Sequence, residues 1–160
     1  MTEQKISPRM RNILDGTAGF NQYLELSKDQ LDAIAALGFR FYEQGKVRDA
    51  ETIFEGLIAL EPKLYYGHAG LGAMALRDEK LDEAVRHLKH AAELKTDDPT
   101  VHANLGEALL RQAKFTEAAS EFDRALNLDP EQRDPGANRA RAILQGMNLV
   151  VSEIQRVGVA

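Results

Sequence analysis

Residues 37–60 read LGFRFYEQGKVRDAETIFEGLIAL, and this stretch decides the fold because it recurs. Its landmarks are a Leu-Gly pair, an alanine in the middle and a leucine at the end. Each landmark returns twice at one constant interval along the chain: Leu37-Gly38, Leu71-Gly72 and Leu105-Gly106; Ala50, Ala84 and Ala118; Leu60, Leu94 and Leu128. Because the three copies of each landmark keep the same spacing without an insertion, the sequence predicts an array of one repeated supersecondary unit.

This interval, with its Leu-Gly, Ala and Pro marks, resembles the tetratricopeptide repeat, a unit of about 34 residues made of a helix, a turn and a second helix. The apolar residues agree with helices, since Val47, Ala50, Phe54 and Leu57 recur at helical spacing. No segment alternates with a period of two, so no sheet is expected. We therefore predict an all-α fold of three tetratricopeptide repeats in a right-handed superhelix, with an N-terminal helical cap and a C-terminal capping helix.

Capping signals divide the chain. Ser27 and Gln30 form a capping box, which predicts the start of a helix. Pro62 ends the first unit, and Asp-Pro pairs at 98–99 and 134–135 open later helices. Within a single domain, 1–160, we predict repeat 1 at 31–64, repeat 2 at 65–98, repeat 3 at 99–132 and a capping helix at 135–158. The expected helices lie near 28–44, 47–60, 65–77, 81–94, 99–112, 115–127 and 136–157.

Both ends of a stacked array expose apolar faces and need covers. The last predicted helix carries one apolar stripe, which we expect to cover repeat 3: Ile143, Leu144, Met147, Val150, Val151 and Ile154. Upstream of the first repeat, residues 7–26 are too apolar for a disordered tail. We interpret this segment as an N-terminal cap, and a dimer surface is the alternative.

Composition narrows the class of protein. The chain has 160 residues with a net charge of −5, and its 25 acidic residues are mixed among 20 basic ones. No basic block indicates nucleic-acid binding. The absence of cysteine excludes disulfides and thiol chemistry. No apolar run is long enough for a signal peptide or a membrane span, so we expect a cytoplasmic protein without membrane insertion.

Residues that could carry chemistry are few. His87 and His90 stand at positions i and i+3 of one predicted helix, which is half of a metal site, but no third ligand is apparent. We interpret them as a solvated helix face. His68 and His102 are separated by one repeat interval and are expected to pack within their repeats. With no nucleophile beside a base and no phosphate-binding loop, we predict no catalytic residue, no metal, no cofactor and no enzymatic activity.

The concave face remains as the predicted binding site, because the first helix of each repeat lines it. Repeat positions 2, 5, 9, 12 and 13 are expected to point into this groove. The predicted groove residues are Ala35, Phe39, Tyr42, Tyr66, Ala69, Ala73, Leu76, Arg77, Ala103, Glu107, Leu110 and Arg111, with Asp32, Glu43 and Thr100 on the same face. Small residues beside aromatic ones make shallow pockets for apolar side chains. The Lys and Asn residues with which other tetratricopeptide proteins clamp an acidic C-terminus are absent, so an extended apolar peptide is expected.

A closer resemblance lies in ILDGTAGFNQYLELSKDQLDAIAALGFRFYEQGKVRDAETIFEGLIALEP, residues 13–62, which is similar to the N-terminal half of class II chaperones of type III secretion. GLGA at 70–73 and PTVHANLGEALLRQ at 99–112 extend the likeness to about residue 130. The resemblance implies a bacterial cytoplasmic chaperone whose groove binds an extended segment of a hydrophobic translocator protein. It also implies that Tyr42 is the groove tyrosine and that a homodimer forms through the N-terminal segment.

Two functions therefore stand beside each other. The first is a peptide-groove chaperone for a secreted, translocator-type protein. The second is a general tetratricopeptide scaffold or adaptor for the assembly of a protein complex, which would use the convex face or the caps. A glutamate in the groove would abolish binding by the first and spare binding by the second.

Overall fold

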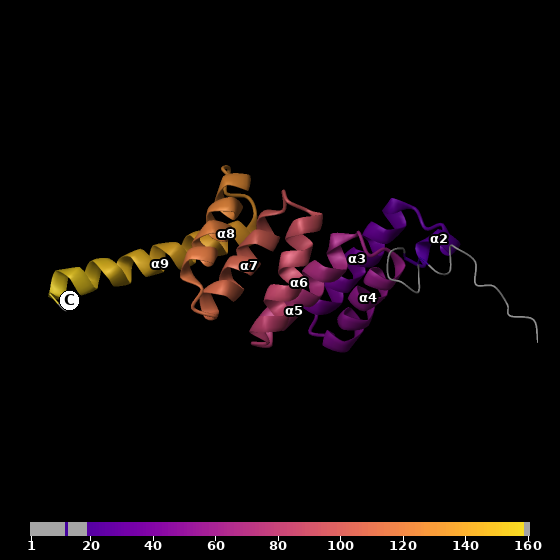
Figure 1. The fold of residues 1–160 in the computed structure, drawn as a ribbon, viewed down its shortest axis with the longest axis horizontal. Coiled ribbons are helices and arrows are strands. Elements are labelled where there is room, and N and C mark those ends of the chain that lie inside the picture. Colours follow the sequence, from indigo (N-terminus) through magenta and orange to yellow (C-terminus); the bar gives the residue numbers. More distant parts are fainter. Residues whose placement is uncertain (1–11, 13–18, 159–160) are drawn as a thin grey trace, which may run out of the picture.

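The computed structural model describes residues 12 and 19–158, which contain helices and turns but no strand. The helices are α2 (Asn21–Leu24), α3 (Lys28–Glu43), α4 (Val47–Leu60), α5 (Tyr65–Arg77), α6 (Leu81–Leu94), α7 (Pro99–Arg111), α8 (Phe115–Leu128) and α9 (Pro135–Val157). The pairs α3–α4, α5–α6 and α7–α8 are antiparallel hairpins that stack in chain order (Figure 1). The fold is an all-α, right-handed superhelix of tetratricopeptide repeats, and the seven long helices begin and end within one residue of the predicted bounds.

The predicted caps hold the helix starts in place. The Ser27 hydroxyl accepts the Gln30 amide at 3.2 Å, and the Gln30 side chain accepts the Ser27 amide at 2.8 Å, which completes a capping box. The carboxylates of Asp98 and Asp134 accept amides of the first turns of α7 and α9, each of which has proline at its first position. Each of these carboxylates also accepts a hydroxyl of the preceding repeat, so the caps join one repeat to the next.

Small residues set the distance between the two helices of each hairpin. Ala50, Ala84 and Ala118 are fully buried. A methyl group added at Gly106 would lie 2.7 Å from the ring of Phe122, which occupies the crossing. The recurring alanine and glycine columns therefore exist because the helices of a hairpin approach too closely for larger side chains.

The capping helix α9 covers repeat 3 along only part of its length. Ile143 and Leu144 pack against the core beneath α9, as predicted. The prediction is wrong for Met147, Val150, Val151 and Ile154, which are 42–60% exposed. The reason is length, because α9 has 23 residues whereas the helices beneath it have 13 and 14. The last turns of α9 project beyond the repeats (Figure 1).

Most of the predicted N-terminal cap, residues 7–26, lies outside the described residues. The described part docks on the end of repeat 1, where the Phe20 amide donates to the Ala59 carbonyl at 2.9 Å. Gly19 is buried there, and a Cβ atom at this position would lie 1.9 Å from the Leu60 carbonyl oxygen. Only glycine therefore fits this contact. Among the described residues, no helix combines the length and the apolar composition needed to cross a bilayer.

Candidate functional site

A cavity of about 760 Å³ runs along the first helices of the repeats and ends at the start of α9. This volume lies in the range of small-molecule and cofactor pockets, about 300–1,000 Å³. The lining residues are Phe39, Tyr42 and Glu43 from α3; Tyr65, Tyr66, Ala69, Ala73, Leu76 and Arg77 from α5; Lys95, Asp97 and Asp98 from the turn; Pro99, Thr100, Val101, Asn104, Glu107 and Arg111 from α7; and Asp134, Pro135, Gly136 and Arg139 from the α9 end. We call this cavity the groove.

The structure brings nine of the twelve predicted site residues together in the groove: Phe39, Tyr42, Tyr66, Ala69, Ala73, Leu76, Arg77, Glu107 and Arg111. Glu43 and Thr100 also line it, whereas Asp32 does not. That any of these residues contacts a ligand remains a prediction.

Three predicted residues lie elsewhere. Ala35 and Ala103 are 1% and 2% exposed and belong to the apolar core. Leu110 is half-buried and packs against the core cluster around α7 and α8. Position 5 of the repeat lies where neighbouring helices meet, so the small side chains of Ala35 and Ala103 serve packing, whereas Ala69, at the same position of repeat 2, is buried and also lines the groove.

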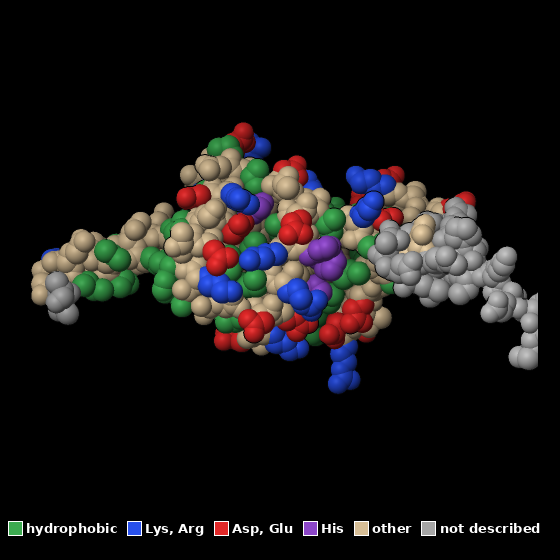
Figure 2. Space-filling model, viewed as in Figure 1, with side chains coloured by type: hydrophobic (Ala, Val, Ile, Leu, Met, Phe, Trp, Pro, Cys, Tyr) green, Lys and Arg blue, Asp and Glu red, His purple; other side chains and the backbone are tan. Residues whose placement is uncertain are grey.

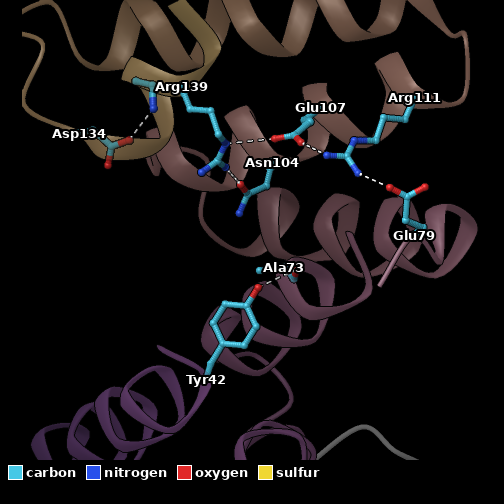
Figure 3. A network of polar contacts seen from close by, with 9 residues as sticks. Tyr42, Ala73, Glu79, Asn104, Glu107, Arg111, Asp134 and Arg139 are labelled. Carbon is cyan, nitrogen blue, oxygen red and sulfur yellow. Dashed lines mark hydrogen bonds and ion pairs between the residues drawn. The ribbon is translucent and has the colours of Figure 1, made fainter. Parts of the chain in front are cut away.

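One half of the groove is apolar and organised around Tyr42. The Tyr42 hydroxyl donates to the Ala73 carbonyl at 3.5 Å, a long hydrogen bond that joins repeat 1 to repeat 2. The Arg77 guanidinium lies 4.6 Å from the centre of the Tyr42 ring, a cation–π contact. Figure 3 shows the Tyr42 side chain reaching from α3 to the backbone of α5. These contacts hold the tyrosine ring as a wall beside the small residues of α5.

The other half is a chain of ion pairs on α7 and α9 (Figure 3). Arg111 pairs with Glu79 at 3.1 Å and with Glu107, and Arg139 donates to Glu107 at 3.0 Å and to Asn104. The arginine side chains are more than a third exposed, so these pairs add little stability. Each guanidinium has five donors, which leaves N–H groups for acceptors on a ligand.

Sequence reasoning missed the far wall of the groove, which includes Asp134, Pro135, Gly136 and Arg139. The predicted groove residues all lie on the first helices of the three repeats, α3, α5 and α7, whereas Arg139 lies on α9. A signal was present in the Asp-Pro pair at 134–135, which repeats the pair at 98–99 and places the first turn of α9 where a fourth repeat would begin.

The histidines pack within their hairpins, outside the groove, and Figure 2 shows histidine side chains gathered on one face of the molecule. His68 Nδ1 lies 2.9 Å from His87 Nδ1, and His102 Nδ1 lies 2.7 Å from a Glu121 oxygen, which confirms the predicted packing of His68 and His102. The prediction of a solvated His87 is wrong, because its side chain is 7% exposed beneath His68. Among the described residues, no three metal-ligating side chains converge.

Their pKa values differ with their partners. Burial, with a smaller contribution from neighbouring cationic groups, lowers the pKa of His68 to about 4 and also lowers the pKa of His87. The hydrogen bond to Glu121 raises the pKa of His102, and the same bond lowers the pKa of Glu121. None of these four side chains lines the groove, and their pKa shifts affect the pH dependence of stability.

Family models identify the repeats. Tetratricopeptide repeat models match residues 35–99 and residues 75–144. The chain belongs to the tetratricopeptide repeat family. This family is a repeat scaffold and not an enzyme family. A comparison with curated protein sequences gave no match.

Solved structures extend the likeness to type III secretion translocator chaperones, as the sequence predicted. The chaperone SycD of Yersinia enterocolitica is 25% identical with a TM-score of 0.65, over 80% of this chain and 97% of that one. PcrH from Pseudomonas aeruginosa is 30% identical with a TM-score of 0.64, over 77% and 95%. PcrH in complex with the chaperone binding region of PopB is 30% identical with a TM-score of 0.61, over 73% and 96%.

Proposed function

We propose that this tetratricopeptide repeat protein is a non-enzymatic chaperone of the bacterial cytoplasm. Its groove would bind an extended apolar segment of a secreted, translocator-type protein. The observation that carries the proposal is a groove in which Phe39, Tyr42, Tyr66 and Leu76 stand beside Ala69 and Ala73. Support comes from similar proteins, since PcrH binds the chaperone binding region of PopB and SycD is a translocator chaperone.

The apolar half of the groove would supply most of the affinity. Removing apolar surface from water is worth about 25 cal/mol per Å², and the alanines leave room between the aromatic walls for inserted side chains. Tyr42 is already held by Ala73 and Arg77, so binding would not have to order it.

The polar half would orient the segment. An extended peptide carries unpaired carbonyl groups, and the free N–H donors of Arg111 and Arg139 lie at one end of the groove. Their position at that end would define which way the bound chain runs.

The test uses a fluorescent peptide that spans the chaperone binding region of PopB, measured by anisotropy. Ala73→Glu places a charge in the apolar half, at a half-buried position, whereas Ala69 is 7% exposed and a glutamate there would also disturb packing. The matched control is Ala119→Glu on the exposed face of α8. We expect Ala73→Glu to weaken binding by about tenfold or more, because the charge is desolvated by the ligand, and Ala119→Glu to bind like the wild type.

Circular dichroism and thermal unfolding of both variants establish that the fold is kept. Equal affinity of the wild type and Ala73→Glu would place the ligand outside the groove and favour the adaptor function. A folded wild-type chain that binds neither this peptide nor a peptide of the translocator YopD would contradict the chaperone proposal.

A further inference from the structure

The polar half of the groove contains a wall that is built from two helices. Asn104, Glu107 and Arg111 lie on α7, and Arg139 lies on α9. The Glu107 carboxylate accepts Arg139 Nε at 3.0 Å and also accepts Arg111 Nη2, so one carboxylate lies between two guanidinium groups (Figure 3). These three charged side chains together leave one positive charge. We call Asn104, Arg111 and Arg139 the donor wall.

The other acidic residues beside the donor wall already hold hydrogen bonds from the chain itself. The Asp134 carboxylate accepts the Thr100 hydroxyl at 2.9 Å and the Ala137 amide at 2.8 Å, and so caps α9. Glu79 pairs with Arg111 at 3.1 Å, but its side chain is 77% exposed and does not line the groove. A ligand therefore meets carboxylates that are already engaged and donors that are not.

Asn104 presents one of these donors. Asn104 is 7% exposed, and its Oδ1 atom accepts Arg139 Nη2. Figure 3 shows the Asn104 oxygen turned toward Arg139 and the nitrogen turned away, and this nitrogen has no hydrogen-bond partner among the described residues. In the described part of the chain, only Asp32 and Gln112 carry a fully buried side-chain atom without a partner. Asn104 Nδ2 is therefore accessible, and Asn104 lines the groove.

Arg139 presents a second donor beside the first. Its Nε and Nη2 atoms bind Glu107 and Asn104, whereas Nη1 has no partner among the residues that the structure describes. The Arg139 side chain is 48% exposed, so a ligand can reach Nη1. A bound ligand that covered Arg139 Nη1 and Asn104 Nδ2 without offering an acceptor would remove both donors from water at a cost in free energy. The wall therefore favours a ligand with acceptors at this point.

We propose that the donor wall binds a carboxylate of the ligand, which is therefore an apolar segment with one acidic group at a fixed distance from its apolar anchors. This inference rests on the proposed chaperone function. A carboxylate brings acceptors only, and its hydrogen bonds to a guanidinium are about twice as strong as those between neutral groups. A backbone carbonyl comes with N–H groups that need acceptors, and the carboxylates of this region are already engaged.

The binding residues differ from those of the tetratricopeptide proteins that clamp an acidic C-terminus. Arg139 lies outside the three repeats, on α9, and Asn104 is positioned by its contact with Arg139. The carboxylate could belong to a glutamate or aspartate side chain or to the end of a chain, because both offer the same two oxygens.

The remainder of the molecule disfavours acidic ligands. The chain has a net charge of −5, so a glutamate at an arbitrary position of a peptide should weaken binding slightly. A preference for glutamate at one position only would therefore come from a local contact and not from general attraction.

A positional scan by fluorescence anisotropy tests the inference. The host is the peptide that spans the chaperone binding region of PopB, and each position in turn carries Glu or its isostere Gln. We expect the wild type to bind Glu about fivefold more tightly than Gln at one position, and to show a ratio near or below one elsewhere. Peptides that end at this position with a free carboxylate or an amide then distinguish a chain end from a side chain.

Substitutions in the protein assign the preference to the donor wall. Arg139→Gln should reduce the Glu-to-Gln ratio to about one, while the affinity for the Gln peptides stays near that of the wild type. Asn104→Asp keeps the shape and replaces the donor by a carboxylate, so it should also abolish the preference. The matched control is Arg133→Gln, which removes the same charge from an 83% exposed side chain outside the groove and should keep the wild-type ratio.

The outcomes separate this inference from the proposed function. Equal binding of Glu and Gln peptides at every position, with no preference for a free chain end, would overturn the carboxylate site and leave the chaperone function standing. A preference that survives in Arg139→Gln would also overturn the site. A folded wild type that binds none of these peptides would contradict the chaperone function and the carboxylate site with it.

Discussion

Repeats 2 and 3 place different residues at the same two positions of the hairpin. As a result, the pKa of the first histidine of the pair is lowered in repeat 2 and raised in repeat 3. His68 and His87 in repeat 2 correspond to His102 and Glu121 in repeat 3, each pair 19 residues apart and less than 3 Å apart in space. In repeat 1 the same points hold Ile34 and Ile53, which pack in the core. The fold therefore accepts an apolar, a neutral polar or a charged pair at one site.

Hydrogen-bond partners define the protonation state in repeat 3. His102 Nδ1 faces the Glu121 carboxylate at 2.7 Å, and Nε2 faces the Thr96 carbonyl at 3.1 Å. Both partners are acceptors, so the arrangement favours the imidazolium form of His102, in which both ring nitrogens donate. The raised pKa of His102 follows from this arrangement.

In repeat 2 the partners require neutral rings. His87 Nε2 lies 3.2 Å from the Arg86 guanidinium, a donor, so this nitrogen accepts and the His87 proton resides on Nδ1. That proton is donated to His68 Nδ1 at 2.9 Å. Protonation of His68 at Nδ1 would break this bond, which agrees with the lowered pKa of His68.

The largest expected effect comes from removing one member of each pair. His102→Leu leaves the Glu121 carboxylate, which is 15% exposed, without its closest partner and with Arg124 at 3.6 Å. We expect a loss of about 3 kcal/mol in the free energy of unfolding, because a buried charge loses its partner. His87→Leu leaves a neutral imidazole beside an apolar side chain, and we expect about 1 kcal/mol. Urea denaturation at neutral pH measures both, and equal losses would refute the contrast.

Lowering the pH should destabilise repeat 2 more than repeat 3, and we expect this effect to be intermediate in size. Below about 6.5 the unfolded chain protonates His68, whereas the folded chain does so only near its pKa of about 4, so repeat 2 loses stability as pH falls through this window. In repeat 3 the raised pKa of His102 keeps its contribution complete below about 6.5 and loses it only as pH rises past the raised value. The lowered pKa of Glu121 keeps its contribution down to below about 4.5.

We therefore expect the wild type to lose about 1–2 kcal/mol of unfolding free energy between pH 7 and pH 5 through repeat 2. The double variant His68→Ile/His87→Ile copies repeat 1 and should lose less over the same range. The difference between the two denaturation series isolates the histidine pair from all other titrating groups. Parallel series would mean that His68 is already free to protonate in the folded chain.

The same columns explain which parts of the molecule the sequence could predict. The helix bounds could be predicted from the Leu-Gly and alanine landmarks, which recur at the constant repeat interval, together with the local proline and capping signals. The interval also predicts the burial of His87. This residue lies one repeat interval before Glu121, at a position of the repeat that faces the first helix. The error came from grouping His87 with its helix neighbour His90 instead of with its column.

Contacts that depend on where a neighbouring helix or repeat ends could not be predicted from the repeat interval. A stripe from Ile143 to Ile154 is continuous in the sequence, and nothing in it shows that the repeats beneath α9 stop near Leu144. The far wall of the groove has the same origin, since Arg139 reaches Glu107 only because α9 begins beside α7. Repeat periodicity predicts contacts inside the array and gives little information at its ends.

The smallest expected effect lies in the hairpin turns, where the repeats also differ at one point. Gly45, Glu79 and Ala113 occupy one column, and all three have positive φ, at 73°, 61° and 59°. A side chain is disfavoured in this left-handed region, so we expect Ala113→Gly to raise the unfolding free energy by about 0.5–1 kcal/mol and Gly45→Ala to lower it by a similar amount. Thermal unfolding should show shifts of about 2–4 °C in opposite directions. Glu79→Gly should gain less than Ala113→Gly, because it also removes the carboxylate that pairs with Arg111, and an equal gain would show that this pair contributes nothing to the turn.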